Sequence, residues 1–269
     1  MDLFVLLQYS FVQQAFVAGI CVAALCAAIG LFLILRKMSL IGDGLSHVSF
    51  GAIALGLFFG VFPLYVALPV TLLAAFFILQ LSQKTKMYSD AAIAIVSSLG
   101  VALGVILVSV SSGLNLSLFS YLFGNILTIT SFEVYCAIFF AAATLIAIIL
   151  FYQDLFYATF DPESARAAGI KVEWINLALV LVTALTVVLA VRMVGVLLVS
   201  ALLVIPPVGA LQVSRGFKQT LALSVALAVG AMVAGIFLSL LIDLPTGATI
   251  VVVNFAVFCG ILALKKIPI

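Results

Sequence analysis

The chain has 269 residues, of which 67% are hydrophobic and only 7% are charged, with a formal net charge of +2 at pH 7. A soluble domain carries about a quarter charged residues, so this composition excludes a soluble globular protein, and the small net charge indicates no nucleic-acid partner. Apolar runs of about 20 residues recur along the whole chain. The sequence therefore predicts an all-α, polytopic helical protein of the cell membrane, with residues 1–269 as one transmembrane domain.

Nine apolar segments predict eight or nine transmembrane helices. They lie at 11–35, 41–60, 62–82, 91–112, 132–152, 174–191, 195–213, 219–241 and 246–264. The second segment is short and polar, so it is either a span or a broken helix. If one of the first two segments does not cross the membrane, the count falls to eight.

Basic residues predict the orientation of these helices. They occur in alternate connections, at Arg36-Lys37, Lys84 and Lys86, Arg166 and Lys171, Arg215 and Lys218, and Lys265-Lys266. By the positive-inside rule these connections are cytoplasmic, which places the N-terminus outside and the C-terminus inside. Arg192 is the one basic residue on the wrong side of this scheme.

Two connections are longer than a turn. Residues 113–131 are amphipathic enough to form an outer re-entrant or interfacial helix. In the connection 153–173, Asp161 suits a helix N-cap, Pro162 the first helical position and Gly169 a C-terminal cap. This pattern predicts a polar cytoplasmic helix of about two turns, which is too short to be stable unless a partner or the ends of the spans hold it.

The sole histidine, His47, follows Asp43 by four residues, so a helix places the two side chains on one face. A carboxylate in a membrane helix costs about 2.5–3.5 kcal/mol on insertion scales and therefore indicates a function. Zinc and manganese both accept imidazole and carboxylate ligands, so the pair can share one divalent cation. An intrahelical hydrogen bond between the two side chains is the equally open structural alternative.

The sequence offers no enzyme site. Ser46 and His47 are adjacent, so on a helix they point about 100° apart and cannot act as nucleophile and base. The chain has no HExxH motif and no second histidine. The residues therefore do not support an intramembrane enzyme. Separately, Pro206-Pro207 is expected to kink the seventh segment.

Several motifs together resemble the permease subunits of ABC importers for zinc, manganese and iron. The resemblance begins in Arg36-Lys37-Met38-Ser39-Leu40-Ile41-Gly42-Asp43-Gly44-Leu45-Ser46-His47. It continues through 122–127, 160–169 and 194–199 and ends in Asp243-Leu244-Pro245-Thr246-Gly247, in family order over nearly the whole chain.

The resemblance implies a membrane permease that forms the translocation path as a homodimer. It also implies a separate ATP-binding subunit, which hydrolyses ATP, and an extracytoplasmic metal-binding protein. Asp43 and His47 match residues taken to line the metal path, and the residues that match the ATPase-coupling helix are Asp161, Pro162, Glu163, Ala165, Arg166 and Gly169.

The resemblance implies a transported divalent metal rather than a permanently bound cofactor. The sequence Asp43-Gly44-Leu45-Ser46-His47 resembles the zinc branch of the family more than the manganese branch. Zinc is therefore the expected cargo, with manganese or iron as the alternative. A second alternative is a proton-coupled secondary cation transporter that uses Asp43 and His47 as a proton relay.

Overall fold

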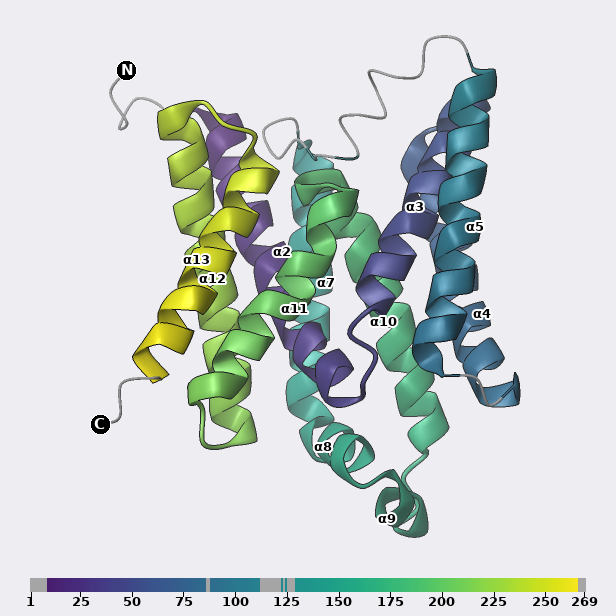
Figure 1. The fold of residues 1–269 in the computed structure, drawn as a ribbon, viewed down its shortest axis with the longest axis vertical. Coiled ribbons are helices and arrows are strands. Elements are labelled where there is room, and N and C mark those ends of the chain that lie inside the picture. Colours follow the sequence, from purple (N-terminus) through teal and green to yellow (C-terminus); the bar gives the residue numbers. More distant parts are fainter. Residues whose placement is uncertain (1–8, 86–87, 112–121, 123, 125–128, 266–269) are drawn as a thin grey trace.

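The computed structural model describes residues 9–85, 88–111, 122, 124 and 129–265. Within them lie eleven helices and no strand (Figure 1). The helices are α2 (Ser10–Leu35), α3 (Ile41–Phe58), α4 (Pro63–Thr85), α5 (Ser89–Val110), α7 (Ser131–Leu150), α8 (Tyr152–Phe160), α9 (Pro162–Ala167), α10 (Val172–Val194), α11 (Val196–Val213), α12 (Phe217–Ile242) and α13 (Thr246–Lys265). The predicted outer helix over 113–131 falls almost entirely outside the described residues.

All nine predicted apolar segments are helical. Among the described residues, eight helices are long and apolar enough to span a membrane, and α11 has a shorter apolar stretch, Leu198–Val213. The helix α3 is continuous, so of the two alternatives left open for the second segment, the broken helix is not observed. Successive long helices run in alternating directions, and α11 also runs from the upper to the lower end of the molecule (Figure 1). This arrangement favours nine crossings.

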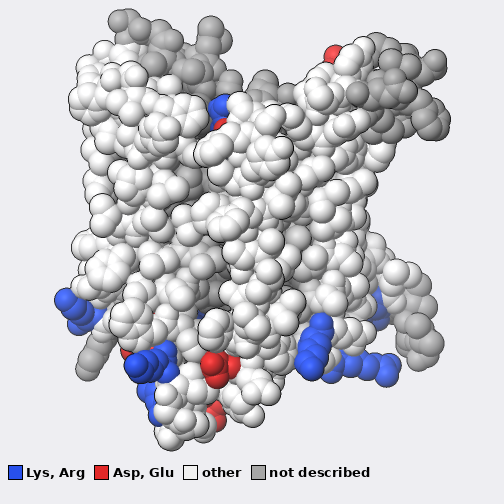
Figure 2. All heavy atoms as spheres, turned by 180° about the vertical axis from the view of Figure 1, so that it is seen from behind, with Lys and Arg blue, Asp and Glu red and all other residues white. Residues whose placement is uncertain are grey.

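The predicted cytoplasmic connections lie at one end of the molecule. The α2–α3 and α11–α12 connections, the last turn of α4, the first turn of α5 and the end of α13 are at the lower end in Figure 1, together with α8 and α9. Figure 2 shows basic side chains concentrated at the same end. By the positive-inside rule, this end faces the cytoplasm.

The connection between the fifth and sixth predicted segments contains two helices instead of the one expected. The predicted helix is α9, and α8 precedes it without having been predicted. Aromatic side chains at successive turns of α8 contact Phe217 at the start of α12 in tilted or edge-to-face geometry. The ring centroids are 5.7 Å away for Tyr152, 5.4 Å for Phe156 and 5.8 Å for Phe160. This contact with α12 stabilises α8, which is too short to be stable alone.

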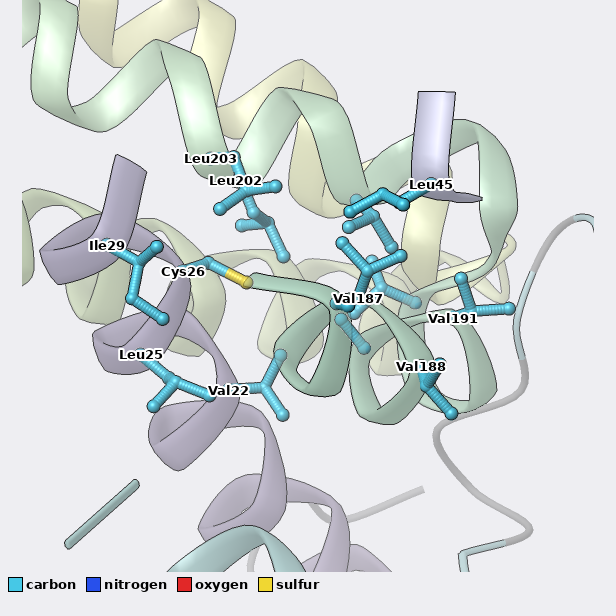
Figure 3. Packing of buried hydrophobic residues seen from close by; sticks show 14 of the residues in the cluster. Val22, Leu25, Cys26, Ile29, Leu45, Val187, Val188, Val191, Leu202 and Leu203 are labelled. Atoms are coloured by element: carbon cyan, nitrogen blue, oxygen red, sulfur yellow. The ribbon is translucent and has the colours of Figure 1, made fainter. Parts of the chain in front are cut away.

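One buried cluster of apolar residues draws on all nine long helices. Figure 3 shows its centre, where Val22 and Cys26 of α2, Val187 of α10 and Leu202 of α11 meet. Leu45 of α3 packs into the same cluster and is fully buried. The core therefore fixes the rotation of α3 about its own axis, and with it the direction in which the opposite face points.

The two prolines of α11 lie inside a helix that continues past them. Pro206 and Pro207 are both within α11, and no cis peptide bond occurs in the described part of the chain. Figure 1 shows α11 turning away from the long axis of the molecule in its lower half. The bend agrees with the predicted kink, because each proline removes a backbone donor and clashes with the preceding turn.

Candidate metal site and coupling helix

The first half of α3 exposes one acidic and one basic side chain and buries the rest. Of the ten residues from Ile41 to Phe50, eight are buried, and only Asp43 and His47 are partly exposed. The Asp43 side chain is 47% exposed and that of His47 is 29% exposed. The structure thus brings the two predicted site residues together on the open face of α3, opposite Leu45.

The separation of the two side chains is slightly too long for a hydrogen bond and slightly too long for two ligands of one ion. Nε2 of His47 lies 3.7 Å from Oδ2 of Asp43, beyond hydrogen-bonding distance. Two ligand atoms that each lie about 2.0–2.2 Å from one ion, at angles between octahedral and tetrahedral, are about 2.8–3.6 Å apart. The intrahelical hydrogen bond is therefore not formed, and a small rotamer adjustment would close the pair around a cation.

The position of Asp43 lowers the cost of its charge. It lies in the first turn of α3, where the helix macrodipole stabilises an anion by about 0.3–1 kcal/mol. The hydroxyl of Ser46 is turned away from the carboxylate and donates to the backbone carbonyl of Asp43 at 2.7 Å. Ser46 and Ser49 are both fully buried, as expected for packing residues rather than ligands.

Close backbone contact with α5 holds α3 in place. A Cβ on Gly51 would lie 2.3 Å from the carbonyl oxygen of Gly100, and a Cβ on Gly100 would lie 2.7 Å from Cα of Val48. Such distances leave no room for a side chain at either position. The glycines therefore let the two backbones touch directly beside His47, and they set where the Asp43–His47 pair lies.

Within the described residues, no group of three or more His, Cys, Asp and Glu side chains could hold a metal ion. The described part of one chain therefore offers Asp43 and His47 as a two-ligand site. A cation bound there must complete its coordination with water, backbone oxygen atoms or side chains from another molecule.

The caps of α9 are those predicted from the sequence. The Asp161 carboxylate accepts a hydrogen bond from the backbone N–H of Ser164 at 3.1 Å, and Pro162 is the first helical residue. Hydrogen bonds from the side chain and backbone of Ser164 hold the pKa of the Asp161 carboxyl below its usual value. At the other end, Gly169 has φ +86° and ends the helix with the two hydrogen bonds of a Schellman motif.

Five of the six predicted coupling residues face outward, and the sixth faces the permease. Asp161, Pro162, Glu163, Arg166 and Gly169 are exposed. Ala165 is 2% exposed and packs against Ala158 of α8 and Val172 of α10. The spans therefore hold α9 through Ala165, and the polar face remains free. Arg166 also pairs with Glu173 of α10 at 2.8 Å.

A second ion pair, not predicted from the sequence, lies at the opposite end from α9. Arg192 near the end of α10 donates through Nε to Oε1 of Glu133 in the first turn of α7, at 2.9 Å. The other carboxylate oxygen of Glu133 accepts from the backbone N–H of Thr130 at 2.8 Å in a capping box. The Thr-x-x-Glu spacing was a local signal for this cap. The pair explains a basic residue on the side that the positive-inside rule disfavours.

The chain is similar in sequence to known membrane proteins of metal transport systems. The profile of the ABC 3 transport family matches residues 8–265. The chain belongs to this family. It is 35% identical over 253 residues to the manganese transport system membrane protein MntC of Halalkalibacterium halodurans, covering 94% of this chain and 87% of that protein.

Further relatives agree with this assignment. The chain is 34% identical to the manganese import system permease protein ScaB of Streptococcus gordonii, over 93% of this chain and 90% of that one. The solved structure of PsaBC from Streptococcus pneumoniae in complex with Fab superposes with a TM-score of 0.85 at 32% identity, covering 96% of this chain and 92% of that chain. The protein is thus a multi-pass membrane permease of a metal ABC importer, a transport component rather than an enzyme, and the secondary-transporter alternative is set aside.

Proposed function

We propose that this permease carries Mn²⁺ along a path whose ligands include Asp43 and His47. The observation that supports this most is the open face of α3, where an acid and an imidazole are the only exposed groups of the helix's first ten residues. The carboxylate offsets part of the ion's lost hydration, and the imidazole adds a neutral donor. Two ligands hold an ion weakly enough for it to leave, which suits transport.

The proposed assembly contains a second copy of the chain. A two-ligand site leaves at least two coordination positions open for a tetrahedral ion and four for an octahedral one. Two copies facing each other through their α3 helices would supply two carboxylates and two imidazoles. These four ligands complete a tetrahedral coordination, and two water molecules would complete an octahedral one.

The other proposed partners bind at opposite ends. An ATP-binding subunit would receive the exposed face of α9 at the end where basic side chains gather. An extracytoplasmic metal-binding protein would deliver the ion at the other end. We assign ATP hydrolysis to the separate subunit, because the relatives of this chain are named as membrane or permease proteins of their transport systems.

Manganese replaces zinc as the proposed cargo. The zinc expectation rested on the wording of residues 43–47, and the relatives described above carry manganese in their names. Asp and His ligate both ions, so chemistry alone does not separate them. Paired aspartates with water give the oxygen-rich coordination that Mn²⁺ prefers, which makes manganese compatible with a dimeric site.

The experiment compares Asp43→Asn and His47→Ala with wild type in cells that lack the native permease. We expect Mn²⁺ uptake to fall at least about tenfold, the low end of what even an outer-shell change costs a metal site. Competition with Zn²⁺ and Fe²⁺ in the same assay identifies the preferred ion. Membrane levels and co-purification of the ATP-binding subunit should be unchanged.

Asp90→Asn is the matched control. Asp90 is also an acid in the first turn of a span, but its side chain is exposed at the start of α5. Its uptake should equal that of wild type. Normal Mn²⁺ uptake by Asp43→Asn would contradict the proposed metal path. Uptake of Zn²⁺ that Mn²⁺ does not inhibit would restore zinc as the cargo.

A further inference from the structure

The turn between α2 and α3 is tied to two cytoplasmic elements by one guanidinium group. Arg36 directly follows α2, and its Nε donates to Oγ1 of Thr159 in α8 at 3.1 Å. Its Nη1 donates to the side-chain oxygen of Asn176 in α10. The hydroxyl of Thr159 in turn donates to the carbonyl of Leu155 at 2.6 Å. The side chain of Arg36 therefore joins the end of α2 to α8 and α10, which lie far from it in sequence.

The bonding of this group is unusual for an arginine. Burial lowers the pKa of Arg36 to about 10, so the group remains charged at neutral pH. Both of its acceptors are neutral, and Nη2 is buried without a hydrogen-bond partner among the described residues. Charge-assisted hydrogen bonds are roughly twice as strong as neutral ones, so the link is firm. The unused donor lets the group take a new acceptor if its neighbours move.

On one side, the link reaches the helices that hold α9. Thr159 follows Ala158, which packs directly on Ala165 of α9. Asn176 lies in the first turns of α10, close in sequence to Val172, the other residue that packs on Ala165. A displacement of α9 thus acts on both acceptors of Arg36.

On the other side, the link reaches the metal pair through a short, hydrogen-bonded turn. Lys37 adopts the left-handed conformation with φ 58°, and the N–H of Met38 donates to the carbonyl of Leu33 at 2.9 Å. The N–H of Ile41 donates to the carbonyl of Met38 at 3.1 Å. The chain then enters α3 at the turn that carries Asp43. These hydrogen bonds tie the turn to the end of α2 and the start of α3.

We propose that Arg36 is a positioning residue that transmits movement of α9, through Thr159 and Asn176, to the Asp43–His47 pair at the start of α3. Arg36 does not touch the ion. It couples the orientation of α3 to the state of the cytoplasmic helices, so that ATP hydrolysis in the subunit docked on α9 changes the proposed metal site. This inference rests on the proposed function of both sites.

The test measures Mn²⁺ imported per ATP hydrolysed by the permease and its co-purified ATP-binding subunit in proteoliposomes, with the extracytoplasmic metal-binding protein supplied. Thr159→Val and Asn176→Leu each remove one acceptor, and Arg36→Lys keeps the positive charge but loses the planar fork. We expect the ratio to fall at least about fivefold in each variant, the low end of typical coupling between sites. ATP hydrolysis should persist in these variants. The separate variant Thr159→Ser, which keeps the hydroxyl, should have the wild-type ratio.

Thr183→Val is the matched control, since the hydroxyl of Thr183 donates to the carbonyl of Leu179 just as that of Thr159 does to Leu155, but within α10. It should leave the ratio unchanged. An unchanged ratio in Thr159→Val and Asn176→Leu would overturn the inference. A parallel loss of uptake, ATP hydrolysis and assembled complex would also overturn it, because that result marks a purely structural role. If Asp43→Asn imports Mn²⁺ normally, the proposed function fails instead, whatever the Arg36 variants do.

Discussion

Individual residues on α3 divide the helix into a buried face for packing and a partly exposed face that carries the two proposed metal ligands. Leu45 is fully buried in the core, whereas Asp43 and His47 remain partly exposed. Gly51 faces the backbone of α5 with no room for a Cβ. The position of the metal pair therefore depends on residues that never contact the metal.

Gly51→Ala should disturb the pair from a distance. The new Cβ would lie 2.3 Å from the carbonyl oxygen of Gly100, so α3 and α5 must separate. Overpacking of this kind costs about 1–3 kcal/mol, and we expect a lower Tm in detergent together with reduced Mn²⁺ uptake. Gly230→Ala in α12 is the control, since a Cβ there meets nothing within 4 Å. If Gly51→Ala keeps both the Tm and the uptake of wild type, the backbone contact does not position the site.

Pairs of helices are tied by ion pairs of two kinds. The side chains of Glu133 and Arg192, which join α7 to α10, are 7% and 25% exposed. Those of Arg166 and Glu173, which join α9 to α10, are 51% and 60% exposed. The first pair lies at an outer helix end with little access to solvent, so removing one partner leaves the other charge poorly solvated.

A double-mutant cycle on Glu133 and Arg192 should reveal this difference. Breaking a buried pair by removing one partner costs about 3–5 kcal/mol, whereas an exposed pair contributes about 0–1 kcal/mol. We therefore expect Arg192→Met to lower the free energy of unfolding in detergent far more than Arg166→Met. Glu133→Gln combined with Arg192→Met should recover part of that loss. Additive effects in the cycle would mean that the two residues do not interact.

The whole molecule is polar at one end and apolar along its sides. Basic side chains gather at the lower end, and α9 projects below the spans there (Figures 1 and 2). Ala165 faces the spans, while Ala168 on the same short connection is exposed. A partner that docks at this end meets the exposed residues and not Ala165.

Ala168→Glu should therefore weaken capture of the ATP-binding subunit while leaving the Tm of the permease unchanged. The added carboxylate is solvated in the free permease but must be desolvated in the docked complex. Ala165→Glu should instead lower the Tm, because it places a charge between Ala158 and Val172. Gln83→Glu, exposed at the same end of the molecule, is the control for added charge. Full recovery of the subunit with Ala168→Glu would show that docking lies elsewhere.

Features that depend on neighbours in the chain were correctly predicted. The nine apolar segments, the caps of α9 and the shared face of Asp43 and His47 follow from hydropathy, cap chemistry and helical periodicity. Each of these is a local property, because backbone hydrogen bonds in a membrane must be made within the helix itself. The two residues proposed as metal ligands could therefore be picked out before their surroundings were known.

Features that depend on contact between distant segments required the tertiary structure. The link from Arg36 to Thr159 and Asn176 and the pairing of Arg192 with Glu133 join residues that are far apart in sequence. The burial of Ala165 and the open side of α3 likewise depend on which helices pack together. An apolar sequence assigns almost every residue to the membrane. It does not indicate which side of each helix faces other helices and which side remains open. Only the packing of the spans decides that, because lipid and protein interior are similarly apolar environments for a side chain.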